Sequence, residues 1–189
     1  YTGSHDLVLQ NLSLEIPANK TTAIVGTSGS GKTTLMKLLL KFYNPIEGVI
    51  HIGAQDLKNI SNKKWRSHCG VVMQEGYIFN DTIANNIAVG YDDIDYSRLE
   101  HAASMANIKD FIEALPLGYN TKIGSEGSGL STGQKQRLFI ARAIYKDPEI
   151  LFFDEATSAL DANNEKIIME NLNQFFEGKT AIVIAHRLS

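Results

Sequence analysis

The chain has 189 residues, with 18 Lys and Arg against 21 Asp and Glu, so its formal net charge is −3 and its length suits one domain. This composition excludes a disordered polyelectrolyte, and it lacks the basic excess that nucleic acid binding requires. The single cysteine, Cys69, excludes an internal disulfide framework, and no uncharged stretch approaches the roughly 18 apolar residues of a membrane span.

The first predicted elements are a strand, a loop and a helix. Residues 21–25 form a short apolar run that ends at a glycine cluster, and residues 32–42 follow with a helical pattern. Pro45 should end this helix, because a proline disfavours the helical conformation in the residue before it. Residues 49–52 then alternate apolar and polar side chains toward Gly53, which predicts a peripheral hairpin.

The middle of the chain is predicted to be mainly helical. After a strand at residues 70–73, the stretch from about 82 to 145 carries apolar residues at one-face helical spacing. Within this stretch, Ser131 and Gln134 form the S-x-x-Q capping box that opens a helix, and that helix should end before Pro148. We therefore expect a helical subdomain at about residues 82–145.

The last part of the chain alternates strands and a helix. Residues 150–153 and 181–185 are continuous apolar runs, as in strands of a parallel sheet that are covered on both faces. Residues 165–176 have helical spacing between them. This alternation predicts an α/β fold with a mainly parallel sheet core, beside which stand the small antiparallel hairpin and the helical subdomain.

Polar residues follow four of the predicted strands. In open α/β sheets the ligand lies beyond the carboxyl ends of the strands, so these polar residues should meet in one site. They are the glycine-rich loop after Val25, Gln74 after Met73, Asp154 and Glu155 after Phe153, and His186 after Ala185.

The glycine-rich loop matches the phosphate-binding pattern G-x-x-x-x-G-K-[ST], between a strand and a helix. Its glycines let successive backbone N–H groups point at phosphate oxygens, Lys32 can reach the β and γ phosphates, and the Thr33 hydroxyl can hold Mg²⁺. A flexible Gly and Ser loop is the alternative. The nucleotide-binding residues predicted here are Thr27, Ser28, Gly29, Ser30, Gly31, Lys32, Thr33 and Thr34.

The acidic pair at the end of the third apolar strand suits metal-assisted hydrolysis. A buried carboxylate such as Asp154 is unfavourable unless it is paired or faces a cation, which suits Mg²⁺. Glu155 beside it suits a general base for the water that attacks the γ phosphate. A solvated Asp and Glu pair is the alternative here, and a satisfied structural histidine is the alternative for His186.

These motifs together identify a family. Their order resembles the nucleotide-binding domain of ATP-binding cassette (ABC) transporters over nearly the whole chain. The elements are the phosphate-binding loop, Gln74, Leu130 to Gln134, Ile150 to Glu155, Ser158 to Asp161 and His186. The resemblance implies an ATPase with ATP and Mg²⁺ as ligands, a P-loop NTPase fold, and residues 1–189 as one ATP-binding domain trimmed at both ends.

The resemblance assigns further roles. It implies that Gln74 contacts Mg²⁺ and the membrane domain, that His186 holds the γ phosphate, and that Tyr1 stacks on adenine. A stray edge-strand tyrosine is the alternative for Tyr1. Lys32, Gln74, Glu155 and His186 are then the catalytic residues, and Thr33, Gln74 and Asp154 are the metal ligands.

Residues 130–134 resemble the family's LSGGQ signature, with Thr132 in place of the first glycine. The resemblance implies that Ser131, Gly133 and Gln134 bind nucleotide held by a second ABC ATPase domain, identical or different, in a head-to-tail dimer. One domain alone would then not complete a site. The β-branched Thr132 stands where close backbone approach is expected.

The sequence is similar to the exporter branch of the family. Residues 74–87 resemble the exporter pattern Q-x-x-x-x-F-x-x-T-I-x-x-N-I, and residues 121–127 resemble the exporter X-loop, with Ser125 and Glu126 departing from it. Overall, the sequence most resembles those of bacterial peptide and bacteriocin exporters. This implies a transmembrane partner domain, a place at the cytoplasmic face of a cell membrane, here the bacterial inner membrane, and export of a substrate such as a peptide.

Other members of the family would share the same ATP site. An importer ATPase is one alternative, and a degenerate regulatory cassette that keeps ATP without hydrolysis is another. A soluble ABC ATPase acting on DNA or ribosomes is the third. The stretch from Gln74 to Leu130 is too short for the long coiled coil of chromosome and repair ATPases. The net charge of −3 also provides no excess of positive charge for binding a phosphate backbone, so we expect no nucleic acid partner.

Overall fold

The core of the protein is a parallel sheet. The computed structural model describes residues 7–73, 76–124, 127, 129–154, 160 and 162–185. The sheet has four strands in the order β1-β8-β7-β4, and all neighbouring pairs are parallel. The strands are β1 (Thr21–Val25), β4 (Cys69–Val72), β7 (Ile150–Asp154) and β8 (Thr180–Ala185). The expected α/β fold with a parallel core is confirmed.

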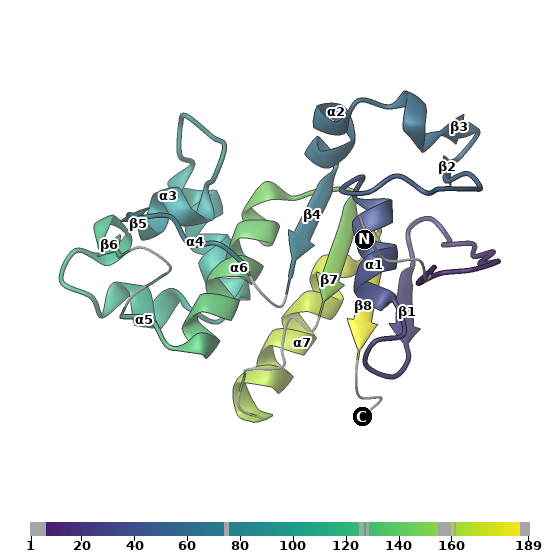
Figure 1. Cartoon of the computed structure of the whole chain (residues 1–189). Helices are drawn as coiled ribbons and strands as arrows, with labels where there is room; N and C mark the ends of the chain where they lie inside the picture. Colours follow the sequence, from purple (N-terminus) through teal and green to yellow (C-terminus); the bar gives the residue numbers. More distant parts are fainter. Residues whose placement is uncertain are drawn as a thin grey trace.

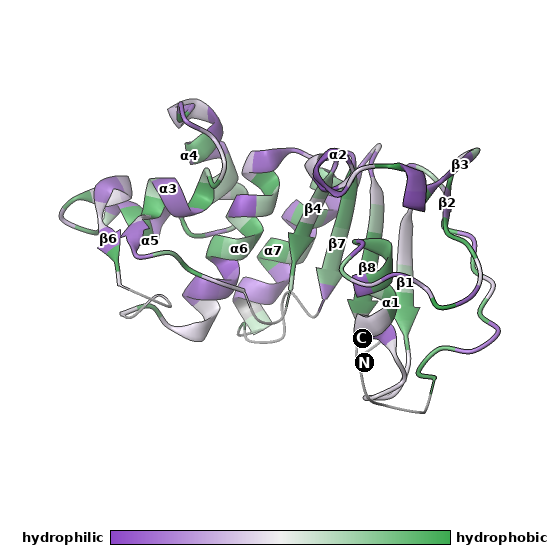
Figure 2. Ribbon diagram, turned by 45° about the horizontal axis from the view of Figure 1, so that its top comes forward, coloured by the Kyte–Doolittle hydropathy of each residue, from purple (hydrophilic) through white to green (hydrophobic). Residues whose placement is uncertain are grey.

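All four strands point the same way (Figure 1), so their carboxyl ends lie along one edge of the sheet. The register places Phe153 of β7 opposite Val72 on one side and Val183 on the other. Figure 2 shows these strands as largely hydrophobic, which fits burial on both faces. The predicted convergence of the strand ends at one edge is therefore confirmed for the described residues.

Different helices cover the two faces of the sheet. They are α1 (Lys32–Leu39) with α2 (Asn62–Ser67) on one face, and α6 (Thr132–Lys146) with α7 (Ala162–Phe176) on the other. Phe152 and Ile182 are buried with Met36 of α1, whereas the alternate residue Phe153 is buried with Leu172 of α7. Alternation along each strand thus divides the core into two layers.

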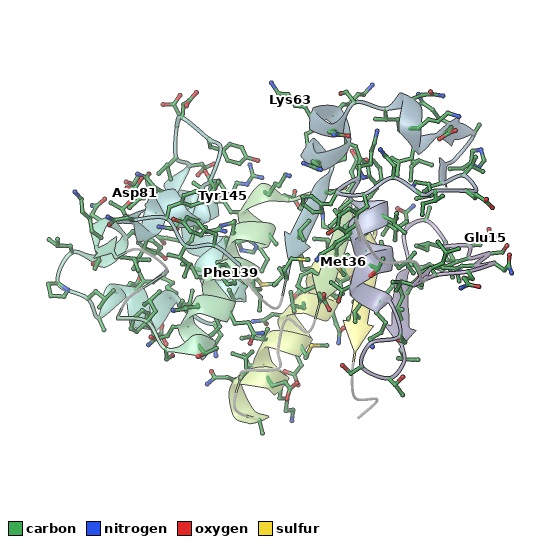
Figure 3. The ribbon with its side chains drawn as sticks, viewed as in Figure 1. Glu15, Met36, Lys63, Asp81, Phe139 and Tyr145 are labelled. Atoms are coloured by element: carbon green, nitrogen blue, oxygen red, sulfur yellow. The ribbon has the colours of Figure 1, made fainter. Side chains whose placement is uncertain are left out.

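A group of helices extends from the sheet on the β4 side (Figure 1). It holds α3 (Ile83–Ile87), α4 (Tyr96–Met105), α5 (Lys109–Glu113) and the start of α6, with the short helix η2 (Gly118–Asn120) between them. A two-stranded antiparallel sheet, formed by β5 (Asp81–Thr82) and β6 (Lys122–Ile123), interrupts this mainly helical stretch. Figure 3 shows Phe139 and Tyr145 along α6, where both are buried.

The predicted hairpin is present but short. It consists of β2 (His51–Ile52) and β3 (Gln55–Asp56) around Gly53, whose φ of 58° favours glycine, and η1 (Leu57–Asn59) follows. The hairpin and α2 lie beyond the amino ends of the strands (Figure 1). Lys63 of α2 projects from this outer edge (Figure 3).

Two boundaries differ from the sequence prediction. The helix expected over residues 32–42 ends at Leu39, because Lys41 takes a left-handed φ of 56° that a helix cannot contain. The strand expected over residues 70–73 instead spans Cys69–Val72. Across the described ranges, no helix is both long and apolar enough to cross a membrane.

Candidate nucleotide site

The loop between β1 and α1 is shaped by two left-handed glycines. Gly29 has a φ of 79° and Gly31 a φ of 91°, a region that other L-residues rarely adopt. The Ser30 N–H donates to the Thr27 carbonyl at 3.3 Å, which closes the turn. A side chain at Gly31 would also place its Cβ 2.8 Å from Leu9. The left-handed conformation therefore favours glycine at this position, and a larger residue would also have to displace the end of the Leu9 side chain.

Gly31 is also the N-cap of helix α1, and no side chain caps the helix there. The first N–H groups of a helix have no partner within the helix, and they carry the positive end of its dipole. Backbone groups at the start of α1 are thus available to an anion. This is the local arrangement that phosphate binding requires.

Lys32 brings a positive charge into the same loop. Only 8% of the residue is exposed, and its Nζ donates to the carbonyls of Gly26 at 2.7 Å and Thr27 at 2.8 Å. These bonds curl the loop around the ammonium group. A phosphate oxygen entering the loop would meet Nζ and could replace one carbonyl as its acceptor.

Thr33 and Asp154 join the loop to the end of strand β7. The Thr33 hydroxyl donates to Asp154 Oδ2 at 3.1 Å, across 121 residues of sequence, and Asp154 is only 5% exposed. A hydroxyl and a carboxylate are the hard oxygen ligands that Mg²⁺ prefers, with phosphate oxygens and water completing its shell. These two residues therefore fit the expected magnesium ion.

Helix α6 begins with the expected capping box. Ser131 Oγ accepts from the Gln134 N–H at 3.2 Å, and Gln134 Oε1 accepts from the Ser131 N–H at 2.8 Å. Ser131 and Thr132 are exposed. Figure 1 shows the start of α6 well apart from the loop before α1, so one chain does not bring Ser131 to its own Lys32.

Four of the predicted site residues, Tyr1, Gln74, Glu155 and His186, lie outside the described residues. Their described neighbours Met73, Asp154 and Ala185 stand at the same edge of the sheet as the loop before α1. Among the predicted residues, the structure brings together Lys32, Thr33 and Asp154 with the loop glycines. Ser131, Gly133 and Gln134 lie at the start of α6, apart from this group.

Sequence reasoning missed two arginines of α6. Arg142 donates to backbone carbonyls of Tyr77 and Asn86, and Arg137 donates to the carbonyl of Asn107. Neither arginine belongs to a recognised motif. For Arg142, the available signal was a charged residue inside the apolar run Leu138 to Ile144, which places a cation on a face that is otherwise buried. Arg137 lies outside that run.

Comparisons with known proteins agree with this geometry. The model of the family described as ABC transporter matches residues 9–158. ABC transporter B family member 14 of Arabidopsis thaliana is 47% identical over the whole chain, which spans 15% of that protein. The ATP-dependent lipid A-core flippase of Saccharophagus degradans is 49% identical over 96% of the chain, which corresponds to 31% of the flippase.

A solved structure has a closely similar fold. A bacterial Atm1-family ABC exporter with ATP bound superposes with a TM-score of 0.92 at 44% identity. The match covers 97% of this chain and 33% of the exporter chain. In length, the chain corresponds to a minor part of each of these three proteins.

Proposed function

The chain belongs to the ABC transporter family, which is a P-loop ATPase family, and we propose that it is the ATP-hydrolysing domain of a longer membrane exporter. Its share of the compared proteins supports the view that a transmembrane domain lies elsewhere in the whole protein. The exporter and flippase names of those proteins support export as the direction of transport. Residues 1–189 would then be one ATP-binding domain, with a helical subdomain at about residues 82–145.

The observation that carries this proposal is the contact between Thr33 and Asp154 beside the buried Lys32. In the proposed site, the loop N–H groups and Lys32 bind the phosphates of ATP, and residues 27–34 supply most contacts. Thr33, Asp154 and Gln74 hold Mg²⁺, which neutralises charge on the β and γ phosphates. Tyr1 stacks on the adenine ring.

Hydrolysis in this site needs a base and a group that holds the γ phosphate. We assign these roles to Glu155 and His186. The Glu155 carboxylate accepts a proton as water attacks the γ phosphorus, the bond from that phosphorus to the bridging oxygen breaks, and the products are ADP and inorganic phosphate. Charge-assisted contacts from Lys32 and His186 stabilise the charge on the transferred group.

A second ABC ATPase domain would complete the site. Ser131 and Gly133, with Gln134 beside them, would contact the γ phosphate bound by the partner's loop, in a head-to-tail homodimer or heterodimer. The exposed start of α6, well apart from the loop of its own chain (Figure 1), supports this arrangement. The dimer would work at the cytoplasmic face of a membrane, the bacterial inner membrane in our proposal.

Titration calorimetry with ATP and Mg²⁺ tests the site. We expect Lys32→Ala to weaken ATP binding by roughly 100-fold or more, because it removes a charge-assisted bond in a partly desolvated site. Asp154→Asn should weaken the Mg²⁺ dependence of binding. The matched control is Lys63→Ala, which removes an exposed lysine at the other edge of the sheet. Equal ATP affinity in wild type and Lys32→Ala would refute the assignment.

The exported substrate is a separate proposal. The sequence resemblance to peptide exporters supports a peptide, whereas one relative is named for a lipid. ATP hydrolysis by the full-length protein in vesicles should rise on adding the exported peptide and stay constant on adding lipid A. The reverse result would replace the peptide with a lipid while leaving the ATPase assignment intact.

A further inference from the structure

Arg142 of α6 holds the segment that follows strand β4. Its Nε donates to the Asn86 carbonyl at 2.8 Å and its Nη1 to the Tyr77 carbonyl at 3.1 Å. Its Nη2 lies 3.4 Å from Asn86 Oδ1. The planar guanidinium thus fixes points at both ends of the segment 77–86, using a fork geometry that lysine lacks.

Asn86 continues these contacts from inside the segment. It is fully buried, its Oδ1 accepts from the Phe79 N–H at 2.8 Å, and its Nδ2 donates to the carbonyls of Phe79 and Thr82, each at 3.0 Å. Both polar ends of the side chain are therefore used. Removing either end would take a hydrogen-bond partner away from partly buried backbone groups.

The same segment also packs closely on α6. A Cβ at Gly76 would lie 2.6 Å from the Phe139 ring, and Ile78 is only 1% exposed. The ring of Phe79 lies 5.8 Å from the Arg142 guanidinium, at a distance that allows a cation–π contact. Polar and apolar contacts together join the segment 76–86 to the middle of α6.

Arg142 carries its charge into a partly buried place. Burial lowers the pKa of its guanidinium to about 10, so it is charged at neutral pH. Among the described residues no carboxylate contacts it, and its hydrogen-bond and cation–π partners are carbonyls, an amide and aromatic rings. Neither an apolar side chain nor a lysine could satisfy carbonyls at both ends of the segment with the same fixed geometry. The arginine therefore points to a need for fixed geometry.

We propose that Arg142 and Asn86 are positioning residues that make the segment 76–86 and helix α6 move as one body. The segment follows Gln74 in the chain, and α6 starts at Ser131, roughly 16 Å along the helix from Arg142 at 1.5 Å per residue. A displacement of the chain near Gln74 would then move Ser131 by a similar amount. This inference rests on the proposed function, in which Gln74 serves the ATP bound by its own chain and Ser131 serves the ATP bound by the partner domain.

The test uses the full-length protein and two readouts. The first is kcat and KM for ATP hydrolysis, and the second is amide hydrogen exchange of residues 76–86. The variants are Arg142→Met, Arg142→Lys and Asn86→Ala. The matched control is Arg98→Lys, which changes an arginine of α4 that packs over Tyr91 and Tyr145 outside these contacts.

We expect Arg142→Met and Asn86→Ala to lower kcat by about 2- to 30-fold, the range that coupling energies of this kind produce, at unchanged KM. Exchange of the Phe79 amide should become faster, while exchange in α1 stays as in wild type. Arg142→Lys should resemble Arg142→Met in kcat, because a charge without the planar guanidinium does not restore the geometry. Arg142→Lys also provides the test if the other variants fail to fold.

Two results would overturn the inference. One is faster exchange in the segment with kcat unchanged, which would leave Arg142 as a local structural contact. The other is a loss of kcat that Arg142→Lys fully restores, because charge alone would then suffice. A wild-type protein that exchanges as expected but neither binds nor hydrolyses ATP would instead refute the proposed function.

Discussion

The two helices whose starts we propose to contact ATP begin in opposite ways. Helix α1 begins at Gly31, which offers no side-chain cap, and Lys32 is buried directly behind it. Helix α6 follows the exposed N-cap Ser131, and its capping box satisfies the N–H groups of Ser131 and Gln134. Both helices present the positive end of a dipole, but no side chain caps α1, whereas Ser131 already accepts a bond from the Gln134 N–H in α6.

This difference suggests a division of labour. The start of α1 can accept phosphate without giving up existing side-chain contacts, so it suits the primary binding of nucleotide by a single chain. The start of α6 is stable by itself, because the Gln134 N–H donates to Ser131 Oγ, and a γ phosphate would have to compete with that oxygen for this N–H. Such a site suits a weaker, later contact, which forms when two chains meet.

The largest predicted effect is a loss of ATP hydrolysis on changing Glu155, which belongs to neither helix start. Glu155→Gln keeps shape and hydrogen bonding but cannot accept the proton, so ATP hydrolysis should fall by roughly 10² to 10⁴ fold. Binding of ATP, which we attribute to α1, should survive. Steady-state hydrolysis and titration calorimetry measure the two quantities. Hydrolysis at the wild-type rate would remove Glu155 from the role of general base.

A second change acts on the start of α1 alone. Gly31→Ala forces a left-handed φ of 91° on alanine and brings its Cβ within 2.8 Å of Leu9. Stability should fall by about 1 to 2 kcal/mol, and ATP affinity by roughly tenfold as the loop shifts. Gly48→Ala is the control, since Gly48 has a φ of 84° but open space around it. Equal ATP affinity in both variants would contradict the role of the loop.

A third change acts on the start of α6 alone. Ser131→Ala removes an N-cap and should lower the free energy of unfolding by about 1 kcal/mol. ATP affinity of the single chain should be unchanged, whereas hydrolysis by the full-length protein should fall. Ser61→Ala is matched to it, because Ser61 caps α2 with a bond from the Lys64 N–H at 3.2 Å. If both variants lowered hydrolysis equally, Ser131 would be only a cap.

The smallest effect is expected at Thr132. Thr132→Gly removes an exposed β-branched side chain from a helix start that must approach a partner's nucleotide. Turnover of the full-length protein should rise or stay the same. A roughly tenfold fall in kcat would mean that the threonine is an adapted contact, and that the two helix starts are more specialised than we propose.

Local patterns in the sequence predict the sheet and much of the site. The apolar runs before Asp154 and at residues 21–25 and 181–185 become strands, and the glycine-rich loop joins β1 to α1 as its motif requires. The capping box at Ser131 also forms as predicted. These features depend on residues within a few positions of one another, which is why one sequence suffices.

Long-range contacts are what the sequence did not predict. Helix α1 ends early, at Leu39, and the ammonium of the nearby Lys41 donates to the carbonyls of Leu57 and Ile60, 16 and 19 residues later. The short strands β5 and β6 pair Asp81 with Ile123. Partners so far apart leave no periodic signal, because the fold alone brings them together.

The central claim is that two chains share each ATP, one through α1 and the other through α6. Light scattering of Glu155→Gln with and without ATP and Mg²⁺ tests it most directly, because blocked hydrolysis should trap the closed pair. We expect a monomer that becomes a dimer when ATP and Mg²⁺ are added and returns to a monomer as nucleotide is removed. A protein that binds ATP yet stays monomeric at high concentration would contradict the shared site.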